Sequence, residues 1–303
     1  MAAFKERHVI VSQPKKRPYG SKVVFALGEG RRIRVDGKAS LLLNDEHIIG
    51  LEPISTEHID NSQRFRMRIE GFATAGEAEL AGMRLSSALL WLAISMNYPL
   101  RLEYHTPLPS MVYNRSDGKT LIGELSHLTV ISRLDAVVEV LKQVYSGKAP
   151  FGDKLLVSME LFASARMELT ERAKFLGLVS ALEPIAEQRD CGQAIEKLTE
   201  QFLTQLGEAQ GISDELRRSL AGRIRDLRRE SVSRSICRLI QSQLSDSKAV
   251  ETIKEAYNVR SKIIHEGSSQ ADLDELGCRV EGVIRRLYSK LTQLELKVPS
   301  VVS

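Results

Sequence analysis

An arginine and a histidine five positions apart, Arg260 and His265, are the residues of this sequence with the most suggestive chemistry. A histidine exchanges protons near neutral pH, so it could take the proton from a ribose 2′-hydroxyl or give one to the leaving 5′-oxygen. An arginine offers planar, paired hydrogen bonds to a phosphate and stabilises the charge of a transition state. Together the two could cleave RNA with no metal ion or cofactor, whereas DNA lacks the 2′-hydroxyl and would not be cut this way.

The position of Arg260 says more than its spacing from His265. With 27 Arg and 6 His in the chain, about one or two matches to such a spacing arise by chance. However, the pattern predicts a helix over 247–265, with Arg260 inside its apolar stripe. The apolar residues on the same face are Ile253, Ala256, Tyr257 and Ile264. A charge in an apolar stripe needs a partner or a functional purpose.

Glu183 is the partner that the sequence offers. Residues 173–186 are apolar nearly all round, which predicts a helix at the centre of a bundle, and Glu183 is the only acid in that run. Pro184 follows it and should kink the helix. An Arg260–Glu183 ion pair is therefore our hypothesis, and the alternative is that each charge reaches water or another partner.

The spacing itself raises a geometric problem for His265. Residues five apart on a helix are separated by about 140° around the axis and about 7.5 Å along it. Either the helix ends near Ile264 and frees His265, with Gly267 as a left-handed stop, or two copies of the segment meet across a dimer. A two-fold dimer brings the same patch of both chains together. Taken alone, His265 could simply be a cation at the negative end of a helix dipole.

Residues 257–267, preceded by 173–186, resemble the HEPN superfamily, and most closely its ApeA-type branch. The resemblance covers about 150–295. It implies a helical bundle that forms homodimers, and many family members are metal-independent ribonucleases in phage defence or toxin systems. The superfamily also contains catalytically silent members that serve in binding or dimerisation.

The family's motif of Arg, four to six residues and His matches Arg260 and His265, which the resemblance implies are catalytic. The family often has Asn, Asp or His after the arginine, and this chain has Ser261 there. The neighbouring residues that we name as supporting are Glu183, Ser261, Tyr257 and Asn258.

An arginine-rich segment precedes this motif. Residues 213–243 read as one long amphipathic helix whose polar side is rich in arginine. The candidates for contact with an RNA backbone are Arg217, Arg218, Arg225, Arg228 and Arg229. The alternative is an ordinary solvated face with pairs of opposite charge.

The elements that must position these residues form the second part of an α+β chain. We expect a flexible basic tail at 1–20, a small α/β domain at 21–148 with a sensor or regulatory role, and an all-α, HEPN-like bundle at 149–303. In the first domain, residues 64–72 alternate as a half-buried strand. The arginines of that strand, Arg64, Arg66 and Arg68, form either a solvated face or an anion-binding surface. Thr74 and Glu77 then predict a capped helix reaching about Met96.

Composition excludes other classes of protein. There is no run of about 20 apolar residues and no apolar core for a signal peptide near Met1, so we expect no membrane contact and a cytoplasmic location. Three separated cysteines predict free, buried thiols and no metal site. Phosphate-binding loops and hydrolase motifs are absent from the sequence.

The sequence thus favours a homodimeric, metal-independent endoribonuclease of phage defence or stress response, with RNA as substrate and a trigger or antitoxin as possible partner. The alternatives are a non-catalytic module that dimerises or binds RNA or nucleotides, and a structural protein in which Arg260 serves only an ion pair.

Overall fold

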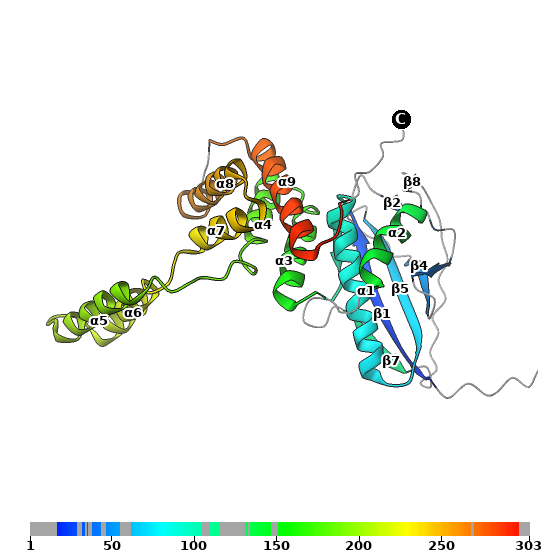
Figure 1. Ribbon diagram of the computed structural model, residues 1–303, viewed down its shortest axis with the longest axis horizontal. Helices are drawn as coiled ribbons and strands as arrows, with labels where there is room; N and C mark the ends of the chain where they lie inside the picture. Colours follow the sequence, from blue (N-terminus) through cyan, green and yellow to red (C-terminus); the bar gives the residue numbers. More distant parts are fainter. Residues whose placement is uncertain are drawn as a thin grey trace, which may run out of the picture. The chain divides into compact units, whose positions relative to one another are not determined.

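The protein is an α+β chain, as the sequence predicted, and it divides into two compact units (Figure 1). The computed structural model describes residues 17–28, 32–33, 35, 38–43, 47–54, 62–104, 110–114, 131–132, 134–146, 151–267 and 270–296. The first unit comprises Met1–Leu89 and Leu102–Pro150, and the second comprises Leu90–Arg101 and Phe151–Ser303. Of the basic tail expected at 1–20, residues 1–16 lie outside the described residues, and Tyr19 begins a strand.

An antiparallel sheet forms the body of the first unit. Its strands are β1 (Tyr19–Leu27), β3 (Ala39–Leu42), β4 (Ile48–Pro53), β5 (Gln63–Phe72), β6 (Leu100–Leu102) and β7 (Met111–Asn114). Their order is β3-β4-β5-β1-β6, and β7 also pairs with β1. A separate parallel pair joins β2 (Arg32–Ile33) to β8 (Ile131–Ser132). The central position of β1 explains why this strand is buried along most of its length.

The strand predicted at 64–72 alternates as expected. Phe65, Met67 and Ile69 are fully buried on one face of β5, and its arginines occupy the other. The partner strand β1 adds Val23 and Phe25 to the same apolar face, opposite Met67 and Phe65. This pairing creates one apolar side of the sheet, which a helix must cover.

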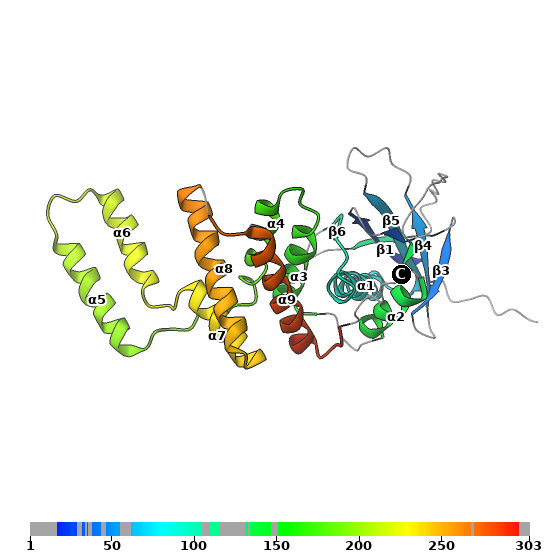
Figure 2. The same cartoon turned by 90° about the horizontal axis from the view of Figure 1, so that it is seen from above.

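Two helices, α1 (Ala75–Ser95) and α2 (Leu134–Tyr145), lie on one face of that sheet (Figures 1 and 2). The capping box predicted for α1 is present: the Glu77 amide donates to Thr74 Oγ1 over 3.2 Å, and the Thr74 amide donates to Glu77 Oε2 over 3.4 Å. Gly82 allows a close approach to β1, because a Cβ there would lie 2.2 Å from Ser21 Oγ.

The described residues of Phe151–Ser303, in the second unit, form seven helices. They are α3 (Asp153–Ala165), α4 (Glu171–Ser180), α5 (Gln193–Glu208), α6 (Asp214–Asp226), α7 (Val232–Leu244), α8 (Ser247–Glu266) and α9 (Leu273–Thr292). Five of these form a bundle: α4 contacts α3, α8 and α9, and α7 contacts α8 and α9. No helix in the described ranges is both long and apolar enough to cross a membrane.

The prediction of one helix over 213–243 is wrong, because the chain breaks between α6 and α7. Ser231 accepts a hydrogen bond from the Arg234 amide and starts α7 as its N-cap. Before it, the backbone pairs with a distant segment: the Cys191 amide donates to the Arg228 carbonyl over 2.7 Å, and the Glu230 amide donates to the Arg189 carbonyl over 2.9 Å. Long-range backbone pairing therefore interrupts a stretch that is helical by local pattern.

A second prediction, of a helix continuing to about 186, is also wrong. Helix α4 ends at Ser180, and turns occupy Ala181 to Ile185. Pro184 supplies the reason, because it disfavours a helical conformation at the residue before it and lacks an amide proton. The proline ends the helix instead of kinking it, and Glu183 sits in the turns that follow.

Candidate active site

Helix α8 carries the Arg260–His265 segment and has well-defined ends. Asp246 caps its start by accepting from the Ala249 amide over 3.1 Å. At its other end Gly267 adopts the left-handed conformation, with φ +77°, and its amide donates to the Ile263 carbonyl. His265 therefore lies within the helix, and the alternative in which the helix ends near Ile264 and frees it is wrong.

The buried stripe of α8 is close to the predicted one. Its buried members are Ala249, Ile253, Ala256 and Ile263. Ile264, which was expected in the stripe, is 50% exposed. The centre of the buried stripe lies closer to Ala256 than the sequence predicted. Tyr257 and Ile264 therefore lie at the edge of the stripe. An exposed isoleucine is thus left beside Arg260 on the surface of the helix.

The predicted ion pair between Arg260 and Glu183 is present. Nη2 of Arg260 lies 2.9 Å from Oε1 of Glu183, and the two side chains are 22% and 35% exposed. The guanidinium carbon also lies 5.3 Å from the centre of the Tyr257 ring, a distance that permits cation–π attraction. Nε of Arg260 is buried, with no hydrogen-bond partner among the described residues. One carboxylate and one ring therefore hold the guanidinium at the bundle surface.

Tyr257 belongs to the same cluster electrostatically. Burial raises the pKa of its phenol above the ordinary value, and the negative charge of Glu183 raises it further, while Arg260 opposes the shift. The hydroxyl consequently stays protonated at neutral pH and is available as a donor.

The other predicted residues do not converge on Arg260 within one chain. His265 and Asn258 are exposed, and Ser261 is half-buried. On a continuous helix, His265 is turned about 140° away from Arg260. A single copy therefore presents the arginine and the histidine on different sides of α8.

A second ion pair of the bundle escaped the sequence analysis. Nη1 of Arg166, just after α3, lies 2.7 Å from Oε1 of Glu281 on α9, and the side chains are only 15% and 12% exposed. Glu281 lies in the buried stripe of α9, next to Val280 and one turn before Ile284, and that position was the available signal. This bundle therefore buries an Arg–Glu pair outside the Arg260 cluster as well.

The arginines proposed for RNA contact do not form one surface. Arg217 caps the end of α5 and donates to the carbonyls of Gly207 and Ala209, each over 2.8 Å. Arg228 pairs with Glu200 over 3.7 Å. Arg218 and Arg225 are exposed, seven residues apart on α6, and Arg229 is exposed beside the break that follows it. Because α6 ends at Asp226, Arg228 and Arg229 lie beyond the helix that carries the other three arginines.

The arginine face of β5 is balanced by acids. Arg66 and Arg68 both lie 2.9 Å from Oε1 of Glu52, and Arg64 pairs with Glu103. Burial lowers the pKa of Lys22 on the adjacent strand, and repulsion from Arg66 and Arg68 lowers it further. This arrangement favours a salt-bridged sheet face over an anion-binding surface.

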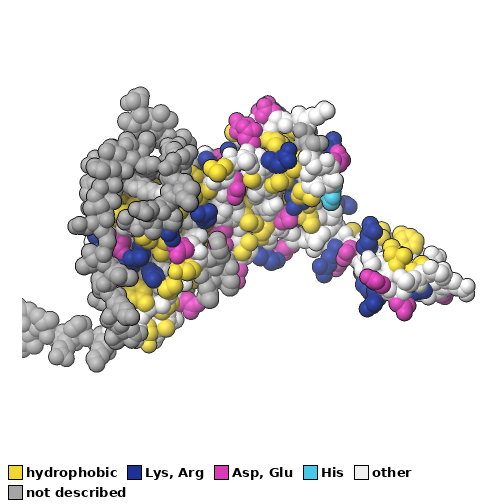
Figure 3. Space-filling view, turned by 180° about the vertical axis from the view of Figure 1, so that it is seen from behind, with side chains coloured by type: hydrophobic (Ala, Val, Ile, Leu, Met, Phe, Trp, Pro, Cys, Tyr) yellow, Lys and Arg dark blue, Asp and Glu magenta, His cyan; other side chains and the backbone are white. Residues whose placement is uncertain are grey.

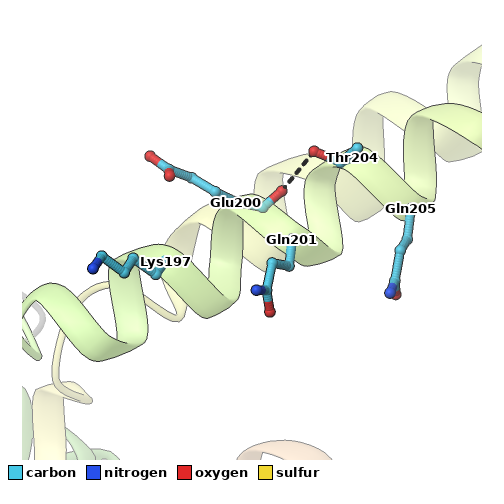
Figure 4. A pocket seen from close by; sticks show the side chains of 5 residues that line it. All are labelled: Lys197, Glu200, Gln201, Thr204 and Gln205. Atoms are coloured by element: carbon cyan, nitrogen blue, oxygen red, sulfur yellow. Dashed lines mark hydrogen bonds between the residues drawn. The ribbon is translucent and has the colours of Figure 1, made fainter.

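Pockets and metal ligands add no competing site in the described ranges. A shallow hollow lies along α5, lined by Lys197, Glu200, Gln201, Thr204 and Gln205 (Figure 4). It is a polar helix face in which the Thr204 hydroxyl donates to the Glu200 carbonyl. No group of three His, Cys, Asp or Glu side chains in the described chain could hold a metal ion. The cysteines are free as expected, but Cys191 and Cys278 are exposed, so the prediction of buried thiols is wrong for them.

Comparison of the chain with family models, with curated proteins and with solved structures finds no match in any of the three.

Proposed function

We propose that the protein is a metal-independent endoribonuclease of HEPN type, whose active site is completed by a second copy of the chain. One observation carries this proposal: Glu183 and Tyr257 hold Arg260 at the surface of α8. An arginine fixed in this way can present its remaining donors to a phosphate with little further loss of side-chain freedom.

In this proposal Arg260 binds the scissile phosphate and stabilises the charge that develops on it. The recorded ion pair uses only Nη2, on the side of Glu183. Glu183 is a positioning residue, and Tyr257 limits the movement of the guanidinium from its ring face. Asn258 is exposed and Ser261 is half-buried on α8, and in this proposal they would contact the ribose or the neighbouring nucleotide.

His265 transfers the proton to or from the ribose oxygens, and it comes from the partner copy. The 140° separation on a straight helix requires this, because one α8 cannot bring both side chains to one phosphate. A two-fold axis beside the exposed Ile264 would place Arg260 of each chain near the partner's His265. Ile264 would then become a buried contact of the dimer.

The test is cleavage of mixed-sequence RNA in the presence of EDTA. Arg260→Ala and His265→Ala should each abolish cutting, by at least about 100-fold. Lys262→Ala is the matched control, because Lys262 is an exposed cation between the two on α8. If metal-independent cutting survives either substitution, the assignment of the site is wrong.

The biological setting that we propose is phage defence or stress response, in the cytoplasm, with the first unit as sensor of a trigger or antitoxin. A regulated enzyme can be silent when purified, so toxicity on expression is the second measurement. Growth inhibition by the wild type that Arg260→Ala and His265→Ala both relieve supports the enzyme.

The Arg166–Glu281 pair favours a second candidate, a non-catalytic helical module, because it shows that this bundle buries ion pairs for structure. In that case Arg260→Ala would lower stability and His265→Ala would behave as the wild type in every assay. Retained RNA binding without cutting would point to a binding module.

A further inference from the structure

Helices α5 and α6 form a hairpin that stands apart from the bundle of the second unit. They pack on each other, and both views show them separated from α7, α8 and α9 (Figures 1 and 2). Within these two described helices, Thr199 is the only buried residue. A single layer of two helices buries only the seam between them, and stable domains need a second layer.

The hairpin exposes large apolar side chains that its own packing does not use. Leu198 and Phe202 on α5 are 42% and 39% exposed, and Leu216 and Leu227 at the two ends of α6 are 51% and 54% exposed. They make up four of the eleven exposed large hydrophobic residues in the described chain. Single exposed leucines are ordinary, but a group of this kind on one small element indicates a contact surface.

These four side chains lie on one face of the hairpin. Leu198 and Phe202 are four residues apart, and Leu216 and Leu227 are eleven residues apart. Each pair therefore lies on one side of its helix. The two helices meet at a half-buried seam that contains Ile195 on α5 and Ile224 on α6. Viewed along each helix from its N-terminus, the exposed apolar side lies in the same rotational direction from this seam. Because the helices run antiparallel, the two sides coincide, and hydrophobic side chains gather on the hairpin in Figure 3.

The opposite side of α5 is polar, which separates it from this apolar face. Lys197, Glu200 and Thr204 lie on that side of the helix, which the close view shows (Figure 4). The hairpin is therefore amphipathic as a layer, with one face made for water and one made for a second layer of helices.

The base of the hairpin holds that face in a fixed direction. Its two strands of backbone pair through Arg189–Cys191 and Arg228–Glu230, and the Glu230 carboxylate accepts from the Arg189 amide over 3.0 Å. Arg238 on α7 donates from Nε to the same carboxylate over 3.0 Å and from Nη2 to the Glu187 carbonyl over 2.6 Å. This anchoring reduces the entropy lost when the face binds a partner.

We infer that the occupant of the apolar face is the same hairpin of a second copy, so that two copies form an antiparallel four-helix bundle. Self-association follows from charge as well as from shape. Helix α5 carries three glutamates against one lysine, whereas α6 carries four arginines against three acids. The favourable pairing sets α5 of each copy against α6 of the other.

That pairing also fixes the symmetry. Setting α5 on the partner's α6, with neighbours antiparallel, requires a two-fold axis parallel to the helices. The bases of both hairpins then lie at the same end of the four-helix bundle, and the two five-helix bundles are neighbours. This inference goes beyond the proposed function and does not rest on it.

The experiment measures the mass and association of the full chain by analytical ultracentrifugation. The wild type should sediment at twice the monomer mass of 33.8 kDa. Leu198→Glu combined with Phe202→Glu should weaken dimerisation by at least about 100-fold, since two charges would be buried in an apolar layer. Lys197→Gln combined with Thr204→Glu changes the net charge by the same two units on the polar side of α5 and should leave the dimer unchanged.

Site-specific photo-crosslinking distinguishes this contact from a dimer held elsewhere. Phe202→p-benzoylphenylalanine should give a covalent dimer whose link maps to the partner's α6, and Thr204→p-benzoylphenylalanine should give none.

A monomer at all concentrations up to about 100 µM would overturn the inference, because hydrophobic interfaces of this kind remain associated at that concentration. A dimer that ignores the Leu198 and Phe202 changes and yields no hairpin crosslink overturns it too, while leaving an interface through α8 and the proposed nuclease intact. Loss of RNA cleavage with the hairpin dimer retained would instead refute only the proposed function.

Discussion

The guanidinium of Arg260 loses part of its hydration, and contacts with protein groups replace that water. The ion pair with Glu183 and the ring of Tyr257 occupy one side, and the side chain keeps 22% of its exposure. Because both charges of the pair still reach solvent, their attraction is screened. The pair therefore stabilises the fold modestly, and its larger effect is to restrict where the guanidinium can point.

Replacing Glu183 separates these two effects. Glu183→Gln keeps the shape and removes the negative charge, so unfolding in urea should show a loss of about 1 kcal/mol after screening is allowed for. RNA cleavage, if the proposal holds, should fall further than this stability change explains. The matched control is Glu187→Gln, whose pair with Lys154 is 76% exposed on the acid side, and its effect on stability should be smaller than that of Glu183→Gln because solvent screens the pair. Equal stability in both variants would contradict the role of the pair.

Glu230, at the base of the hairpin, gives a dependence on pH. The hydrogen bond from Arg238 lowers its pKa below the ordinary 4.5, and the Arg189 amide and the charge of Arg234 lower it further. The folded state therefore favours the ionised carboxylate, which stabilises the fold at pH values above 4.5. That stabilisation disappears as the pH falls through the lowered pKa.

Glu230→Gln should consequently be less stable than the wild type at pH 7, and the difference should shrink steadily below pH 4.5. Urea unfolding at a series of pH values measures this. Glu251→Gln, at an exposed position of α8, serves as the control and should follow the wild-type curve. A difference between Glu230→Gln and wild type that stays constant down to pH 3 would contradict the linkage.

At the scale of elements, a buried hydrogen-bond chain ties three parts of the bundle together. The Ser158 hydroxyl on α3 donates to the Ala181 carbonyl after α4 over 2.5 Å, and Tyr288 on α9 lies 2.7 Å from the same hydroxyl oxygen. Complete burial raises the pKa of Tyr288 far above its ordinary value, so its phenol remains a donor. Each group has a partner, which is the condition for polar groups in a core.

Ser158→Ala breaks this chain and leaves both Tyr288 and the Ala181 carbonyl without a partner. Thermal or urea unfolding should show a loss of about 2–3 kcal/mol, and Tyr288→Phe should lose about 1 kcal/mol because it removes the donor itself. The double variant should lose less than the sum, since the phenol is no longer stranded. Full additivity of the two changes would argue that the groups are not coupled.

The sequence predicted elements where local pattern decides them and missed breaks that depend on distant contacts. The period-2 strand at 64–72 and the Thr74 capping box are local signals, and both were correct. The break before Ser231 arises from backbone pairing across some forty residues, and no periodicity records it. The strands β3 and β7 depend on their neighbours in the sheet, and they too were not predicted.

The site was predicted with similar limits. The Arg260–Glu183 pair could be inferred because each charge interrupts an apolar run. By contrast, Arg166 and Glu281 form a more deeply buried pair in segments that also carry other charges, so they gave a weaker signal. The 50% exposure of Ile264 could not be predicted from spacing either. An apolar stripe about 100° wide leaves the position of its centre uncertain by tens of degrees.

At the scale of the whole molecule, the proposed site has a consequence that a site within one chain would not have. If Arg260 acts with the partner's His265, each dimer holds two sites, and each site takes one residue from each chain. A chain with Arg260→Ala and a chain with His265→Ala are then individually inactive. In a mixed dimer, however, one site combines two altered residues, and the other combines an intact arginine with an intact histidine.

Mixing the two inactive variants should therefore restore cleavage. At equal concentrations with free exchange, half of the dimers are mixed and each has one of two sites, so about a quarter of the wild-type rate should return. The measurement is RNA cleavage with EDTA after the two proteins are unfolded and refolded together. Refolding each variant alone is the control, and it should remain inactive. If the mixture stays inactive while crosslinking shows mixed dimers, the arginine and the histidine do not act across two copies, and the 140° between them on α8 then argues against any shared site.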